Sequence, residues 1–68
     1  MIIQVNGKQQ ELGGPGLLQD LIDQLGLSDK RIAVEVNLEI VPRSQYREHQ
    51  LSEGDQVEIV HAIGGGEF

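Results

Sequence analysis

The segment that most constrains the fold is residues 17–25, where leucine and isoleucine recur at the spacing of one helical face and polar residues fall on the other side. Gly16 is expected to be the N-cap, and Asp20 lies in the first turn, where the helix dipole favours an anion. Gly26 fits a left-handed C-cap. A helix with one apolar stripe needs a second layer against which to bury it.

In the remaining periodic segments apolar and polar residues alternate, as they do in β-strands. Asn6-Gly7 is the favoured pair for a two-residue type I′ hairpin turn, because both central residues need positive φ. Pro42 ends a short apolar stretch and suits a strand end better than a ladder interior. The strand regions are expected at residues 2–12, which include the hairpin turn, and at 32–37, 40–41 and 57–63. Residues 43–51 are expected to form a loop with a turn of helix. This order predicts an α+β fold in two layers, with one helix on a mixed sheet of four to five strands.

Size and charge narrow the class of protein. A chain of 68 residues forms one domain with a small core, and without cysteine it is held by aliphatic packing alone. The net charge of −6 disfavours nucleic acid and favours a positively charged partner surface. No apolar run is long enough to cross a membrane and no basic flank precedes the first apolar residues, so we expect a cytoplasmic protein, monomeric when free, without a membrane partner.

The side-chain inventory contains no catalytic constellation. The three serines lie in expected turns or loops, His49 lies in a polar loop and His61 on a strand, and two histidines cannot form a structural zinc site. Glu35 and Glu58 are expected on the outward side of half-buried strands. We therefore expect that the chain is not an enzyme and holds no metal ion. We expect a scaffold or binding surface without catalytic side chains of its own.

The C-terminal residues form the least ordinary part of the sequence, with three consecutive glycines at 64–66 followed by Glu67 and Phe68. Three residues beyond Ile63 reach roughly 10 Å in extended form, and without side chains they could pass through a narrow channel. A terminal glycine also leaves its carboxyl carbon open to attack. The alternative is a frayed terminus. We divide the chain into a domain at residues 1–63 and a flexible Gly-rich tail at residues 64–68.

In combination, five segments resemble the ThiS family, the ubiquitin-like sulfur carrier proteins of thiamine biosynthesis. They are IIQVNGK, LLQDLIDQL, RIAVEVNLEIVPRSQY, LSEGDQVEIV and HAIGGG, in that order and over nearly the whole chain. The resemblance implies the β-grasp fold, in which the first and last strands pair in parallel.

The resemblance also implies the chemistry. A ThiF-type enzyme would use ATP and Mg²⁺ to adenylate the C-terminal glycine, and sulfur drawn from cysteine through a desulfurase would replace AMP to give a thiocarboxylate. The thiazole synthase ThiG would then take the sulfur. The carrier itself would bind no cofactor, and Gly66 would be the acyl residue after removal of Glu67-Phe68.

The same resemblance assigns the partner contacts to residues at the end of the last strand and in the tail. The expected partner-binding residues are Val60, Ala62, Ile63, Gly64 and Gly65. For Val60 the alternative is a core or edge residue of the strand. Arg43 and Tyr46 match a family stretch that we interpret as a structural loop.

The sequence departs from the family in two places. Gly16 stands where most members have Thr, which costs only a few tenths of a kcal/mol at an N-cap. Glu67-Phe68 extends past the terminal glycine, either as a precursor segment that a protease removes or as a remnant of a cloning site. Three alternatives stay open: a MoaD-like carrier of molybdopterin synthesis, a carrier for cysteine or another sulfur metabolite, and a non-covalent β-grasp binding module.

Overall fold

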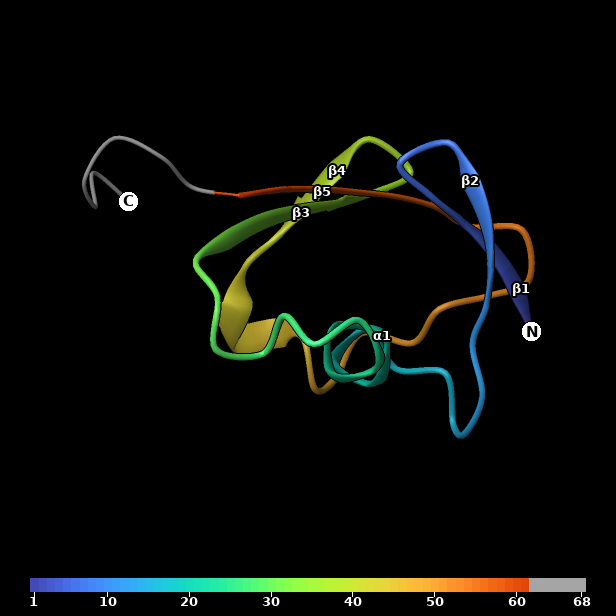
Figure 1. Ribbon diagram of the computed structural model, residues 1–68, viewed down its shortest axis with the longest axis horizontal. Coiled ribbons are helices and arrows are strands. Elements are labelled where there is room, and N and C mark those ends of the chain that lie inside the picture. Colours follow the sequence, from blue (N-terminus) through green and yellow to red (C-terminus); the bar gives the residue numbers. More distant parts are fainter. Residues whose placement is uncertain (62–68) are drawn as a thin grey trace.

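The computed structural model describes residues 1–61 and forms two layers, a curved sheet and one helix packed beneath it (Figure 1). The elements in chain order are β1 (Ile2–Val5), β2 (Lys8–Glu11), α1 (Leu18–Gln24), β3 (Ile32–Val36), β4 (Glu39–Val41), the 3₁₀ turn η1 (Arg43–Gln45) and β5 (Gln56–His61). No helix in this described part is long and apolar enough to cross a membrane.

The sheet has the strand order β2-β1-β5-β3-β4, which places the last strand at its centre. β5 runs parallel to β1, with Val5 opposite Val57, and antiparallel to β3, with Val34 opposite Ile59. The five-stranded mixed sheet and the parallel pairing expected from the family resemblance are both confirmed.

The first hairpin also agrees with the prediction, and a second hairpin was not foreseen. Asn6 and Gly7 both have positive φ, 52° and 81°, as a type I′ turn requires. Asn37 and Leu38 likewise have positive φ, 51° and 71°, between β3 and β4. Leucine rarely adopts this conformation, so sequence reasoning had no reason to place a two-residue turn there.

The predicted start of the helix was wrong by one residue. Leu17 is the N-cap, and its backbone N–H donates to Oδ2 of Asp20 at 3.0 Å. Gly16 instead has a φ of 81° and is buried, and its carbonyl accepts from the N–H of Leu51 at 2.9 Å. This left-handed conformation is strained for any residue with a Cβ, which accounts for glycine here.

The loop after β4 covers the N-terminal end of α1. The N–H groups of Leu18 and Gln19 donate to the carbonyls of His49 and Tyr46, at 2.8 Å and 2.9 Å. These are two of the donors that a helix start leaves without intrahelical partners. The loop is therefore structural, as its sequence indicated.

The other end of α1 closes as predicted. Gly26 has a φ of 73°, and the N–H of Leu27 donates to the carbonyl of Ile22 at 2.9 Å. The N–H of Gly26 donates to the carbonyl of Asp23 at 3.0 Å, which completes a Schellman motif.

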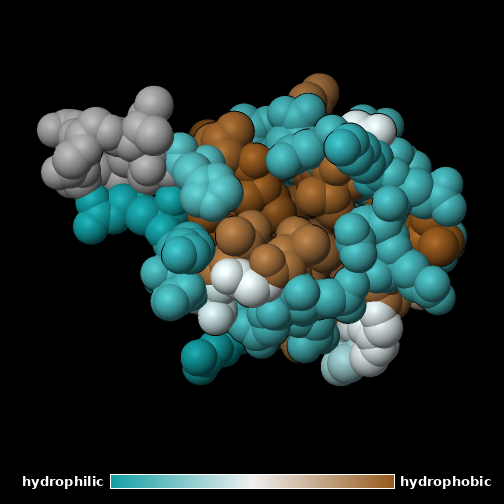
Figure 2. Space-filling view, viewed as in Figure 1, coloured by the Kyte–Doolittle hydropathy of each residue, from teal (hydrophilic) through white to brown (hydrophobic). Residues whose placement is uncertain are grey.

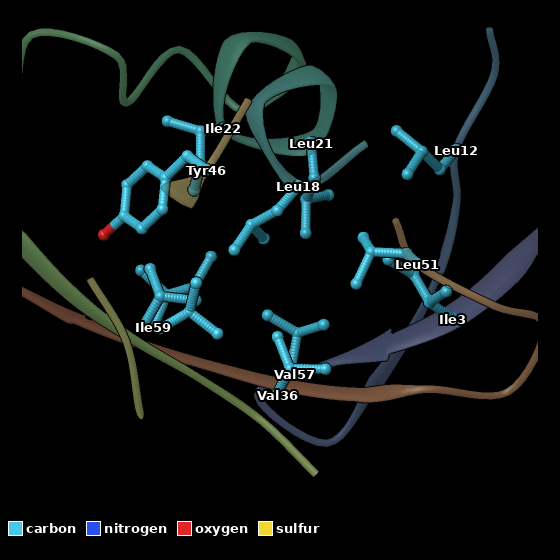
Figure 3. Close-up of a cluster of buried hydrophobic side chains, with 12 residues drawn as sticks. Ile3, Leu12, Leu18, Leu21, Ile22, Val36, Tyr46, Leu51, Val57 and Ile59 are labelled. Atoms are coloured by element: carbon cyan, nitrogen blue, oxygen red, sulfur yellow. The ribbon is translucent and has the colours of Figure 1, made fainter. Parts of the chain in front are cut away.

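One apolar cluster fills the space between the layers (Figure 3). Figure 3 places Tyr46, Ile22 and Ile59 at one end of the cluster and Leu12, Leu51 and Ile3 at the other. In the space-filling view, apolar side chains lie between the sheet and the helix and hydrophilic ones surround them (Figure 2). The buried members are Ile3, Leu12, Leu18, Leu21, Ile22, Val34, Val36, Val41, Tyr46, Leu51, Val57 and Ile59.

Candidate functional site

The strand that leads to the glycines is the central strand of the sheet. β5 alternates strictly, with Val57 and Ile59 buried against the helix and Glu58 and Val60 exposed on the opposite face. It is hydrogen-bonded on both sides, and its last residue, His61, lies opposite Ile32 of β3. The described chain therefore ends on the central strand of the sheet, which at His61 is paired with β3.

The side chain of Asn6 extends the pairing of β5. Its Oδ1 accepts from the backbone N–H of Ile59 at 2.8 Å, and its Nδ2 donates to the carbonyl of Ile59 at 3.1 Å. The backbone N–H of Asn6 also donates to the carbonyl of Val57 at 2.9 Å. The amide thus replaces a strand residue where β1 has already ended, and it holds the second half of β5 in place. Sequence reasoning identified only the turn, because the partner lies 53 residues away.

The sheet face opposite α1 carries both apolar and acidic side chains. Residues directly opposite in antiparallel strands point to the same face, so Ala33 shares a face with Val60, and Glu35 with Glu58 and Ile40. Val60 is 61% exposed and Ile40 is 75% exposed. We name this set the open-face patch: Ala33, Glu35, Ile40, Glu58 and Val60.

The turn between β3 and β4 adds another exposed apolar side chain near this patch. Leu38 has a positive φ and is 85% exposed. Glu39 and Ile40 follow it directly in β4. An exposed leucine in an unfavourable backbone conformation gives nothing to the core. Such outliers tend to cluster where proteins bind other molecules.

The predicted partner-binding residues divide into two groups. Val60 lies on the open face of a central strand, so it is neither a core nor an edge residue. Ala62 and Ile63, as well as Gly64, Gly65 and Gly66, lie outside the described residues, as do Glu67 and Phe68. Ile40 and Ala33 were missed, because only the strand pairing brings them beside Val60.

The described residues offer no arrangement for catalysis. Within residues 1–61 no three His, Asp or Glu side chains gather as metal ligands, and no polar or charged residue is buried. Burial raises the pKa of the Tyr46 phenol, an effect that the nearby Arg43 guanidinium partly offsets. A buried tyrosine with a raised pKa is a packing residue rather than a proton donor at neutral pH.

Comparison with known proteins gives a consistent result. The chain matches the ThiS family over residues 3–66. It is 39% identical to the sulfur carrier protein ThiS of Bacillus subtilis, over 96% of this chain and the whole of that protein. It is also 39% identical to a thiazole synthase of Paramagnetospirillum magneticum, over 97% of this chain but only 20% of that protein.

A solved structure agrees in both fold and sequence. The crystal structure of the thiamine biosynthesis protein ThiS from Geobacter metallireducens superposes with a TM-score of 0.81 at 29% identity. The alignment covers 97% of this chain and all of that one.

Proposed function

The chain belongs to the ThiS family of sulfur carriers in thiamine biosynthesis, and on this premise we propose that Gly66 is the residue on which it carries sulfur. The observation that supports Gly66 most directly is that the family match ends at this residue. The protein is a small carrier rather than a catalyst.

The terminal chemistry needs two substitutions, the first at the α-phosphorus of ATP and the second at the acyl carbon of Gly66. The Gly66 carboxylate would attack the α-phosphorus of ATP and release pyrophosphate, and a sulfide-level sulfur nucleophile would then attack the acyl carbon and release AMP. Both steps belong to a ThiF-type enzyme. A cysteine desulfurase would supply the sulfur as a persulfide, and a thiol would reduce it to the sulfide level and be oxidised to a disulfide. The carrier provides a carbonyl carbon without a neighbouring Cβ.

The fold separates the contacts that hold β5 in place from the residue that would carry sulfur. β5 is held by β1 as far as Val57, by the Asn6 amide at Ile59 and by β3 as far as His61. The five residues from there to Gly66 span at most about 17 Å. A partner that binds the tail would thus meet the surfaces next to the end of β5. We propose that the open-face patch, together with Ala62, Ile63, Gly64 and Gly65, forms that contact.

The proposed acceptor of the sulfur is a thiazole synthase of the ThiG type. Two relatives named thiazole synthase, from Paramagnetospirillum magneticum and Magnetococcus marinus, contain a segment similar to nearly all of this chain. The chain spans about a fifth of each, 20% and 21%. Carrier and acceptor sequences therefore occur together in one polypeptide, which favours thiamine over molybdopterin synthesis as the pathway.

The experiment that tests the carrier function uses the chain trimmed to Gly66. Incubation with ATP, a ThiF-type enzyme and a sulfur source should replace one terminal oxygen by sulfur, as measured by intact mass. The chain that retains Glu67 and Phe68 should stay unmodified. Lack of modification of the trimmed chain would refute the proposal.

Gly66→Ala in the same trimmed chain is the matched variant. It should slow thiocarboxylate formation and leave the free energy of unfolding within about 0.5 kcal/mol, because the buried cluster of the described residues is built from Ile3 to Ile59. Transfer of sulfur from the modified carrier to thiazole synthase, but not to the large subunit of molybdopterin synthase, would separate the two pathways.

A further inference from the structure

The basic residues of this acidic chain gather at one end of the domain. The chain has five Lys and Arg residues against eleven Asp and Glu, yet four of the five lie around two neighbouring hollows. Lys30, Arg31 and Arg43 border one hollow, and Arg43 and Arg47 border the other. We name these four side chains the basic end.

Tertiary structure rather than sequence brings the basic end together. The Nη2 of Arg43 donates to the backbone carbonyl of Lys30 at 2.6 Å, which joins the segment before β3 to the loop after β4. All four residues are exposed. The fifth basic residue, Lys8, begins β2, the strand at one edge of the sheet.

The basic end adjoins the point where β5 ends. Arg31 directly precedes Ile32, and Ile32 lies opposite His61. In the view of Figure 2, hydrophilic side chains gather at the end of the molecule where β3 begins and β5 ends. A partner that takes the C-terminal segment approaches this end of the domain.

We infer that the basic end docks on a carboxylate-bearing surface of the enzyme that activates the C-terminal glycine. The inference rests on the proposed function, and it adds a specific charge pattern to that enzyme. Its acidic surface would attract the basic end, which orients the tail toward the active site during encounter.

A protein surface fits this end better than a phosphate group does. Asp23 borders one hollow and Asp29 the other, so a compact dianion would meet a carboxylate in either. No buried polar side chain of the described residues points into the hollows as in a built anion site. Exposed charges spread over open hollows instead resemble the rim of a protein interface.

Charge reversal at matched positions tests the inference. Arg47→Glu and Lys8→Glu each reverse one exposed charge, and Lys30→Glu with Arg31→Glu reverses two. Arg43 is left unchanged because it holds the Lys30 carbonyl. The affinity of each trimmed chain for the ThiF-type enzyme is measured by calorimetry without ATP, and the KM for the carrier is measured during thiocarboxylate formation.

We expect the double variant to bind about tenfold more weakly and Arg47→Glu about threefold, with kcat retained and Lys8→Glu within about twofold of the original chain. Raising the salt concentration from about 50 mM to about 500 mM should reduce these differences. Circular dichroism melting of each variant verifies that it is folded.

Equal affinities for all three variants would overturn the inference, even if the original chain is converted to the thiocarboxylate. A chain that binds with the expected charge dependence but gains no sulfur would refute the proposed function alone. Saturable binding of tripolyphosphate at the basic end, detected by amide NMR shifts and with unchanged enzyme affinity in Arg47→Glu, would also overturn the inference in favour of an anion site.

Discussion

On the side of the sheet that faces α1, Val34, Val57 and Ile59 are at most 6% exposed, whereas on the other side Ile40 and Val60 are 75% and 61% exposed. The first set comes from β3 and β5 and the second from β4 and β5, because successive side chains of a strand point to opposite faces. The helix covers one set and nothing within residues 1–61 covers the other. One face of these strands therefore stabilises the fold, and the other exposes side chains that a partner can contact.

The largest expected effect is on stability, from a substitution in the core between α1 and the sheet. Leu21→Ala should lower the free energy of unfolding by about 3 kcal/mol, because a fully buried leucine leaves a cavity between α1 and the sheet. Val60→Ala is the matched truncation on the open face and should cost less than about 0.5 kcal/mol while weakening binding to the activating enzyme. Chemical denaturation measures the free energy of unfolding of both variants, and equal losses would contradict the division between the two faces.

The second effect concerns the link between β1 and β5. Asn6→Ala removes both hydrogen bonds to Ile59 and should cost about 1–2 kcal/mol, because it leaves the partly buried N–H and carbonyl of Ile59 without partners. Amide hydrogen exchange should accelerate at Ile59 more than at Val34. Asn37→Ala is the control, because it removes a turn asparagine that bonds Asp55 and the N–H of Gln56 at the start of β5, and it should leave Ile59 protected.

The third effect tests strain on the open side. Leu38→Gly should raise the free energy of unfolding by about 0.5–1 kcal/mol, because glycine accepts the φ of 71° without a Cβ clash. The same change removes an 85% exposed leucine, so affinity for the activating enzyme should fall. A destabilised variant, by thermal melting, would show that Leu38 contributes to folding.

The smallest effect concerns two carboxylates. Glu35 and Glu58 lie directly opposite in β3 and β5, and like charges so placed destabilise a sheet. Glu58→Gln should therefore stabilise the fold by about 0.2–0.5 kcal/mol at low salt, and the gain should shrink as salt is added. Glu53→Gln, outside the strands, is the control for general charge reduction.

Local features of the fold could be predicted because they depend on near neighbours. The helix stripe, the Asn6-Gly7 turn and the C-cap at Gly26 each involve residues within a few positions of one another, and all three are confirmed. The predicted N-cap was one residue too early. Gly16 has a left-handed conformation and its carbonyl accepts from the N–H of Leu51, which lies far along the chain. The candidate site followed the same rule, since Val60 lies near the glycines in the chain and was named with them, whereas only strand pairing brings Ile40 beside it.

The sequence by itself determined the helix and the inward faces of β3 and β5, because side-chain periodicity is a local property. Only the tertiary structure decided that Asn6 clamps Ile59, that Ile40 lies with Val60 on the open face and that Lys30 and Arg31 lie near Arg43. The periodicity left open whether the first and last strands are neighbours, and the family resemblance alone supplied their parallel pairing. Such contacts join segments far apart in the chain, and their partners are selected by the joint burial of the helix and the sheet rather than by any single segment.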